Sequence, residues 1–131
     1  MNIGLIAHDS KKELMVNFCI AYKNILIKHN LYATGTTGQQ IEDNVDLKVY
    51  TFLPGHLGGD RQMCAQIECN QIDALIFLRN PAHPSERDVD FERLVQLCDL
   101  NNIPVATNLA TAELLVIAID RGDLDWRNLY K

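Results

Sequence analysis

Short apolar runs alternate with amphipathic segments along the chain, and this alternation is the main guide to its fold. A short apolar run bounded by polar or turn residues is typical of a buried strand. The runs with this character are Asn2 to Ala7, Asn30 to Ala33, Leu47 to Leu53, Ala74 to Leu78 and Ile103 to Ala106. Pro104 removes one hydrogen-bond donor from the last run, so we expect that strand to pair least fully.

Apolar residues at helical spacing fill the intervals between these runs. The first helix is predicted to extend to Lys28, with Ser10 as its N-cap and Glu13 completing a capping box. The other predicted helices are roughly two turns ending near Asn44, then Arg61 to Cys69, Phe91 to Cys98, and Ala110 to Arg121 with Gly122 as C-cap. The tail from Asp123 to Lys131 is expected to be only partly regular.

Repeated strand–helix alternation predicts an α/β fold: a single-domain, doubly wound, mainly parallel five-stranded sheet over residues 1–131, with helices on both faces. In such sheets the ligand site lies beyond the carboxyl ends of the strands. A polar cluster follows each predicted strand: His8-Asp9, Thr34 to Gly38, Gly55 to Asp60, Arg79 to Asp90, and Thr107-Asn108. We therefore expect these clusters to form one site.

The turn from Thr34 to Gly38 is the most informative of these clusters. A strand that breaks at glycines and restarts as a helix directs backbone N–H groups and a helix N-terminus at one spot, which suits an anion such as phosphate. Three threonine hydroxyls add donors at the same place. The alternative is a tight turn in which Thr36 or Thr37 only caps the following helix.

Composition narrows the function classes. The 131 residues are 47% hydrophobic and carry a net charge of −5 without a basic stripe, which argues against a nucleic-acid partner. No apolar run approaches membrane-spanning length and no basic segment precedes an apolar one at the start, so we expect a cytoplasmic protein without membrane association. The cysteines lack CxxC or zinc spacing and are expected to be reduced: Cys19, Cys64, Cys69 and Cys98.

Five motifs carry a family resemblance. They are Ile6-Ala7-His8-Asp9 with Lys11-Lys12 in the next turn, Tyr32 to Gly38, Leu57-Gly58-Gly59-Asp60, Ile103 to Asn108, and the ending Gly122-Asp123-Leu124-Asp125. In combination they resemble methylglyoxal synthase over nearly the whole chain. The resemblance implies conversion of dihydroxyacetone phosphate, a triose phosphate, to methylglyoxal and inorganic phosphate. It also implies a homo-oligomer, usually a homohexamer, that needs neither metal nor organic cofactor.

The resemblance implies roles for single residues. Asp60 is the catalytic base, and the Gly58-Gly59 pair before it permits close approach of the backbone to a substrate. His8 stabilises the enediolate oxygens, and Asp90 assists proton movement. The residues implied to bind the phosphate or the substrate oxygens are Lys12, Thr34, Gly35, Thr36, Thr37, Gly55 and Arg87.

Each of these roles has a structural alternative when the residues are taken alone. Asp60 also suits the N-cap of a helix starting at Arg61, and Asp90 a first-turn carboxylate favoured by a helix dipole. His8 is equally a polar residue that ends the first strand, and Lys12 a solvated lysine.

The chain departs from the family pattern between Arg79 and Asp90. Arg87 stands where family members usually have histidine, and an arginine stabilises anionic oxygens but does not shuttle protons near neutral pH. His83 is the alternative proton carrier. Three further departures are Asn80 for aspartate, Pro54 for serine and His56 for proline.

Two other functions remain open at this stage. One is a non-catalytic module that binds phosphorylated ligands, as similar domains of carbamoyl phosphate synthetase do. The other is a related lyase acting on a different triose or pentose phosphate. In the tail, Arg127 and Lys131 either reach a neighbouring subunit's site or serve surface solubility.

Overall fold

The sheet of the computed structural model, which describes residues 1–54, 57–82 and 91–131, is built from parallel strands. Within these residues the strand order is β3-β2-β1-β4-β5, and every neighbouring pair is parallel. The strands are β1 (Asn2–Ala7), β2 (Asn30–Ala33), β3 (Val49–Thr51), β4 (Ala74–Leu78) and β5 (Val105–Ala106). The predicted doubly wound α/β fold is confirmed.

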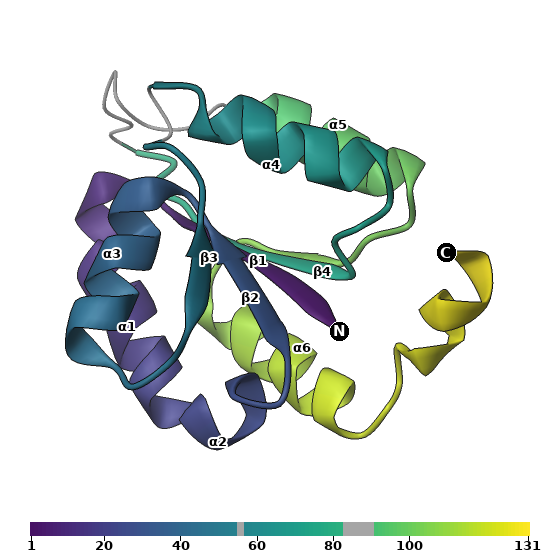
Figure 1. Cartoon of the computed structure of the whole chain (residues 1–131), viewed down its shortest axis with the longest axis horizontal. Coiled ribbons are helices and arrows are strands. Elements are labelled where there is room, and N and C mark those ends of the chain that lie inside the picture. Colours follow the sequence, from purple (N-terminus) through teal and green to yellow (C-terminus); the bar gives the residue numbers. More distant parts are fainter. Residues whose placement is uncertain (55–56, 83–90) are drawn as a thin grey trace.

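Helices cover both faces of the sheet (Figure 1). On one face lie α1 (Lys12–Ala21), α2 (Lys23–Leu26), α3 (Gly35–Asn44) and α6 (Leu109–Asp120). On the other lie α4 (Gly59–Glu68) and α5 (Phe91–Leu100). Alternate residues of β1 face the two layers: Leu5 packs with the first group and Ile6 with the second. Both faces of the central strands β1 and β4 are therefore buried, which explains why these two appear as continuous apolar runs.

The strand order places a topological switch at the centre of the sheet. From β1 the chain moves outward to β2 and β3, and then returns to the other side of β1 to form β4 and β5. Successive connections therefore leave in opposite directions from the carboxyl ends of β1 and β4. That divergence creates the crevice in which doubly wound folds bind ligands.

Several predicted boundaries are wrong for local reasons. Ser10 does not cap the first helix: residues Asp9–Lys11 form a 3₁₀ turn (η1), and the Ser10 hydroxyl instead accepts a hydrogen bond from Asn80 Nδ2 at 3.0 Å. The helix predicted to reach Lys28 breaks at Tyr22, which has a φ of −110°.

The third strand is shorter than predicted because its flanking N–H groups bond elsewhere. Leu47 donates to the Val45 carbonyl at 2.8 Å, and Leu53 donates to Gln62 Oε1 at 2.7 Å. The last strand keeps two residues, and Pro104 still supports it, because its carbonyl accepts the Leu75 N–H at 3.0 Å.

The end of α6 follows its prediction. Gly122 has a φ of +82°, a left-handed conformation that glycine adopts without strain. Its N–H donates to Ile119 and the next N–H, of Asp123, donates to Ala118. These paired bonds are the Schellman motif, which satisfies the last carbonyls of the helix.

Candidate functional site

His8 directly follows β1 and is held beside the end of β4. The His8 backbone N–H donates to the Leu78 carbonyl at 3.0 Å, which continues the β1–β4 pairing by one residue. His8 is only 5% exposed. The backbone N–H of Asn80 donates to His8 Nδ1 at 2.9 Å. A nitrogen that accepts a hydrogen bond carries no proton, so the neutral ring holds its proton on Nε2. His8 is therefore set up as an Nε2–H donor at the carboxyl edge of the sheet.

Lys12 lies in the first turn of α1 and is folded back over the end of β1. Its ammonium donates to the Ala7 carbonyl at 2.9 Å and to Asp9 Oδ1 at 3.0 Å. The side chain is 12% exposed, so the alternative of a solvated lysine is wrong. An ammonium has three donors, and two of them are used by these bonds. The remaining donor suits an anionic oxygen.

The turn at Thr34 becomes the N-terminus of α3. The helix already begins at Gly35, inside the turn, and its N-cap Thr34 makes no side-chain capping bond. Thr36 and Thr37 occupy the first turn, so neither is the cap. Their N–H groups have no acceptor inside the helix. A helix start that its own side chain leaves uncapped is suited to bind an anion.

The Thr37 hydroxyl shows the same property. The residue is 1% exposed, and its Oγ1 has no hydrogen-bond partner among the described residues. A buried hydroxyl without a hydrogen-bond partner lowers the stability of a protein by roughly 1–3 kcal/mol. Such hydroxyls are therefore usually bonded to a ligand or an ordered water. Gly35 differs, because its N–H already donates to the Leu53 carbonyl at 3.0 Å. Its N–H is therefore engaged within the protein.

The segment after β3 brings the N-termini of α3 and α4 together. The Leu53 carbonyl accepts from Gly35, and the Pro54 carbonyl accepts from Gly59 at 3.0 Å. A Cβ on Gly35 would lie 2.7 Å from the Phe52 carbonyl oxygen, and one on Gly59 would lie 1.8 Å from that of Leu53. Glycine is thus needed at both helix starts for the protein's own backbone to pass between them.

Asp60 stands in the first turn of α4 and is half-buried. The N-cap of this helix is Gly58, so the alternative of Asp60 as N-cap is wrong. Its Oδ1 accepts from the Arg61 N–H at 2.9 Å. The residue lines a groove of about 330 Å³ together with Arg61, Cys64, Ala65, Glu68 and Arg93. This groove lies along α4 and α5, and His8, Lys12, Thr36 and Thr37 are not among its lining residues.

Aromatic contacts pack His8 against the end of β4 and the start of α5. The rings of His8 and Phe77 meet edge to face at 5.2 Å, and Phe77 meets Phe91 in the same way at 5.4 Å. The Arg79 guanidinium lies 4.0 Å from the centre of the Phe91 ring. Arg79 belongs to a polar cluster that was expected at the site, whereas the sequence indicated Phe77 and Phe91 only as parts of a strand and a helix. The signal was available, since Phe77 and Arg79 belong to the carboxyl end of a central strand.

Three predicted site residues cannot be placed. Gly55, Arg87 and Asp90 lie outside the described residues, as does His83. The described candidates, by contrast, all stand at the carboxyl ends of β1 and β2 or in the first turns of the helices α1, α3 and α4: His8, Lys12, Thr34, Gly35, Thr36, Thr37 and Asp60.

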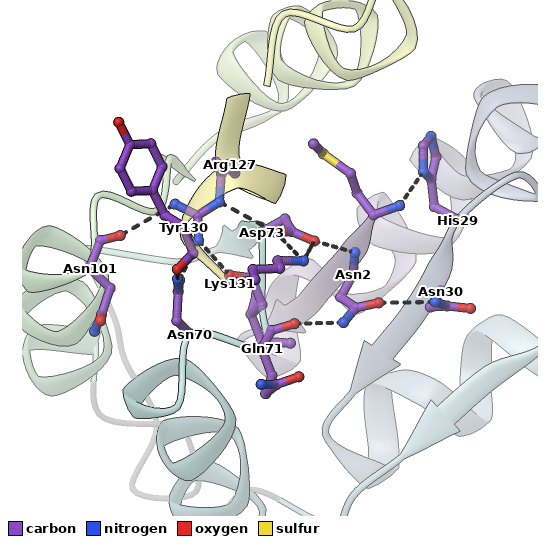
Figure 2. Close-up of polar contacts among 12 residues, drawn as sticks. Asn2, His29, Asn30, Asn70, Gln71, Asp73, Asn101, Arg127, Tyr130 and Lys131 are labelled. Atoms are coloured by element: carbon purple, nitrogen blue, oxygen red, sulfur yellow. Dashed lines mark hydrogen bonds and ion pairs between the residues drawn. The ribbon is translucent and has the colours of Figure 1, made fainter. Parts of the chain in front are cut away.

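The C-terminal tail forms buried ion pairs with the rest of the chain, which the sequence did not predict. Arg127, in the 3₁₀ segment η3 (Asp125–Tyr130), is 2% exposed and pairs with the fully buried Asp73 at 3.4 Å. Lys131 Nζ lies 2.6 Å from the same carboxylate (Figure 2). Both expectations for Arg127, a neighbour's site and surface solubility, are wrong. The tail is instead attached to the amino-terminal edge of its own sheet, opposite the candidate site.

Arg127 also joins the turns that follow α4 and α5 (Figure 2). It donates to Asn70 Oδ1 and the Ile72 carbonyl on one side, and to the carbonyls of Asn101 and Asn102 on the other. Burial raises the pKa of Asp73, but the Asn2 N–H, Lys131 and Arg127 outweigh it and leave the pKa below its ordinary value.

The described residues offer neither a metal site nor a membrane-spanning helix. Across residues 1–54, 57–82 and 91–131, no three His, Cys, Asp or Glu side chains are grouped so that they could hold a metal ion. None of the helices described there is both long and apolar enough to span a bilayer. The cysteines are all free, as expected.

Known proteins resemble this chain along most of its length. An MGS-like domain family matches residues 14–107. The methylglyoxal synthase of Caldicellulosiruptor saccharolyticus is 60% identical over 129 residues, which are 98% of this chain and 92% of that protein. The enzyme of that name from Clostridioides difficile is 48% identical over 131 residues, covering 100% of this chain and 96% of the relative. The crystal structure of methylglyoxal synthase from Elizabethkingia anophelis superposes with a TM-score of 0.86 at 39% identity, covering 88% and 76% of the two chains. With this match in sequence and fold, the chain belongs to the methylglyoxal synthase family.

Proposed function

We propose that this chain is a lyase that converts dihydroxyacetone phosphate to methylglyoxal and inorganic phosphate. The observation that carries the proposal is the gathering of His8, Lys12 and the uncapped α3 N-terminus at one sheet edge, in a chain 60% identical to a methylglyoxal synthase. The family relationship supports a small phosphorylated substrate, and the residue roles below are proposals.

The phosphate would bind at the start of α3. The N–H groups of Thr36 and Thr37, the Thr37 hydroxyl and the Lys12 ammonium, which has two bonds among the described residues, all suit its oxygens. A helix N-terminus and a buried ammonium both favour negative charge. Gly35 would not donate its N–H to the phosphate, because that N–H is bonded to Leu53; its lack of a side chain leaves room for the segment after β3. Thr34 would contribute through its extended backbone, which leads from β2 into the helix.

Asp60 would act as the base. It removes a proton from the hydroxymethyl carbon next to the carbonyl, and the electron pair of that C–H bond forms an enediolate. The negative charge develops on the former carbonyl oxygen, where a fixed donor stabilises the transition state. His8 Nε2–H is the donor in the described part of the site that suits this oxygen.

Elimination completes the reaction. The former carbonyl oxygen gains a proton and the neighbouring terminal hydroxyl loses one, so that the negative charge stands on the terminal oxygen. That oxygen then forms the aldehyde C=O, the C=C electron pair moves to the phosphate-bearing carbon, and the C–O bond breaks with its electron pair leaving on the phosphate. The resulting enol loses its hydroxyl proton and gains one at its methylene carbon, which gives methylglyoxal. This step requires the breaking bond to stand out of the enediolate plane, where it overlaps the π system. The phosphate-binding groups would hold that torsion and stabilise the leaving anion as its charge grows. The same intermediate, held with the bond in the plane, would be protected from elimination.

The test is a turnover assay with purified protein and dihydroxyacetone phosphate. We expect methylglyoxal and inorganic phosphate to appear in equal amounts. Binding of the substrate without release of either product would overturn the proposal and favour a ligand-binding module. Turnover of a different sugar phosphate alone would show a related lyase.

We further propose that the chain forms a homohexamer, as the family resemblance implies, and that it acts in the cytoplasm, as its hydrophobic pattern led us to expect. Light scattering of the purified protein would test the assembly, with six copies of the 14.8 kDa chain as the expected result. A monomer at the concentration of the assay would contradict it.

A further inference from the structure

Asn80 connects the ends of the two central strands. It follows β4 by one residue, and the register that pairs Ala7 with Leu78 places it beside His8. Its backbone N–H donates to His8 Nδ1 at 2.9 Å. This bond requires the lone pair of Nδ1. A proton on Nδ1 would set two N–H groups against each other, so the contact selects the ring form protonated on Nε2.

The Asn80 side chain fixes the backbone that makes this contact. Nδ2 donates to Ser10 Oγ at 3.0 Å, and Oδ1 accepts from the Ala82 N–H at 3.1 Å. The second bond is an Asx-turn, which holds the segment after β4 in one conformation. The first ties that segment to η1, directly after His8. A carboxamide has both the donor and the acceptor that these two bonds need.

We infer that Asn80 is a positioning residue that holds His8 in the Nε2–H form and aims that N–H at the substrate oxygen. The inference rests on the proposed function, because the purpose of the N–H is to stabilise an enediolate oxygen. Asn80 itself acts through His8 and needs no contact with the substrate. Removing its side chain frees the segment after β4, and the Nδ1 contact becomes intermittent.

The first measurement is the tautomer of His8, read from ¹⁵N shifts of protein labelled at histidine. The sequence has four histidines, and His8→Gln identifies the signal. At about pH 8.5 the wild type should show a protonated Nε2 and a bare Nδ1, as the bond from the Asn80 N–H requires. Asn80→Ala and Ser10→Ala should both move the two shifts toward each other. Asn17→Ala, the same change on the exposed face of α1, should leave them in place.

The second measurement is kinetic. We expect Asn80→Ala to lower kcat by about 10- to 100-fold, while KM changes less than about threefold, because the phosphate-binding turn is intact. Ser10→Ala should lower kcat less, because it removes only the bond between Ser10 and Asn80. The double variant should have the same kcat as Asn80→Ala, because Asn80→Ala has already removed that bond.

The outcomes separate the inference from the proposed function. A wild-type His8 protonated on Nδ1 overturns the inference, and so does an Asn80→Ala variant whose tautomer is unchanged, whatever its kcat. If Asn80→Ala does not fold, the exposed Ser10→Ala variant decides by the same shift. Absence of methylglyoxal from the wild type refutes the proposed function alone, because the tautomer is measured without substrate.

Discussion

The two edges of the sheet treat their polar groups in opposite ways. At the amino-terminal edge, a guanidinium has five N–H donors, and those of Arg127 meet five acceptors around the buried Asp73 (Figure 2). At the carboxyl edge, the Thr37 hydroxyl is buried without a described partner and the start of α3 is uncapped. The Arg127 network is satisfied within the described residues, whereas the carboxyl edge leaves donors for the phosphate group that we propose as its ligand.

The two edges are therefore expected to contribute to different properties, one to stability and the other to binding and turnover. A buried charge network that is fully bonded is costly to break, because removing one member leaves the others buried without a partner. Donors without an acceptor make the free protein less stable, and they bind an anion more tightly for the same reason. The comparison predicts that substitutions at one edge change stability, and that substitutions at the other change turnover or binding.

The largest effect is expected from Asp60→Asn. The amide cannot take the substrate proton, so turnover should fall by about 10²- to 10⁴-fold, the usual contribution of a general base. Inhibition by inorganic phosphate and the thermal midpoint should stay close to wild type, because the phosphate site and the core are untouched. Unaltered turnover would remove Asp60 from the role of base, and a large loss of stability would break the comparison.

Arg127→Met should have its effect on stability alone. Deleting one partner of a buried ion pair typically costs about 3–5 kcal/mol, measured here as the free energy of urea unfolding. Turnover per folded molecule should be unchanged. Arg121→Met is the matched control, because Arg121 pairs with Asp123 on the surface with 66% of its side chain exposed. Such pairs contribute about 0–1 kcal/mol, so equal losses in both variants would contradict the buried network.

Thr37→Val should change phosphate affinity and the stability of the free protein in opposite directions. Loss of the buried hydroxyl should weaken phosphate binding by about 1 kcal/mol, or roughly fivefold. The same change removes an unsatisfied polar atom, so the free protein should be more stable by up to about 1 kcal/mol. Calorimetric binding and urea unfolding measure the two effects. Thr37→Ser, which keeps the hydroxyl, should bind phosphate like the wild type.

The smallest expected effect is on how the free energy of unfolding changes at acid pH. The folded-state pKa of Asp73 lies below the ordinary carboxyl value of 3.8, so its ionised form stabilises the fold. That contribution is complete above the ordinary value and is lost as the pH falls below it toward the folded pKa. Between about pH 5 and pH 3, wild-type protein should therefore lose more unfolding free energy than Asp73→Asn. Parallel curves for the two proteins would show that Asp73 does not carry this pH dependence.

Much of the fold follows from local patterns. The runs Asn2–Ala7, Asn30–Ala33 and Ala74–Leu78 match β1, β2 and β4. The central strands β1 and β4 were the clearest, because a strand buried on both faces has to be apolar throughout. Gly122 ends α6 as expected, since its backbone conformation suits glycine. Boundaries were wrong where a distant partner intervened, as at Ser10 and at Leu53.

The sequence by itself determined the α/β alternation, the position of polar clusters after each strand, and the family. Those properties depend on residue type and spacing along the chain. Only the tertiary structure decided that Asn80 meets His8, that the N–H of Gly35 is already used, and that Arg127 is buried against Asp73. Each of these contacts joins segments far apart in sequence, and its hydrogen-bond partner is set by how the strands and helices pack.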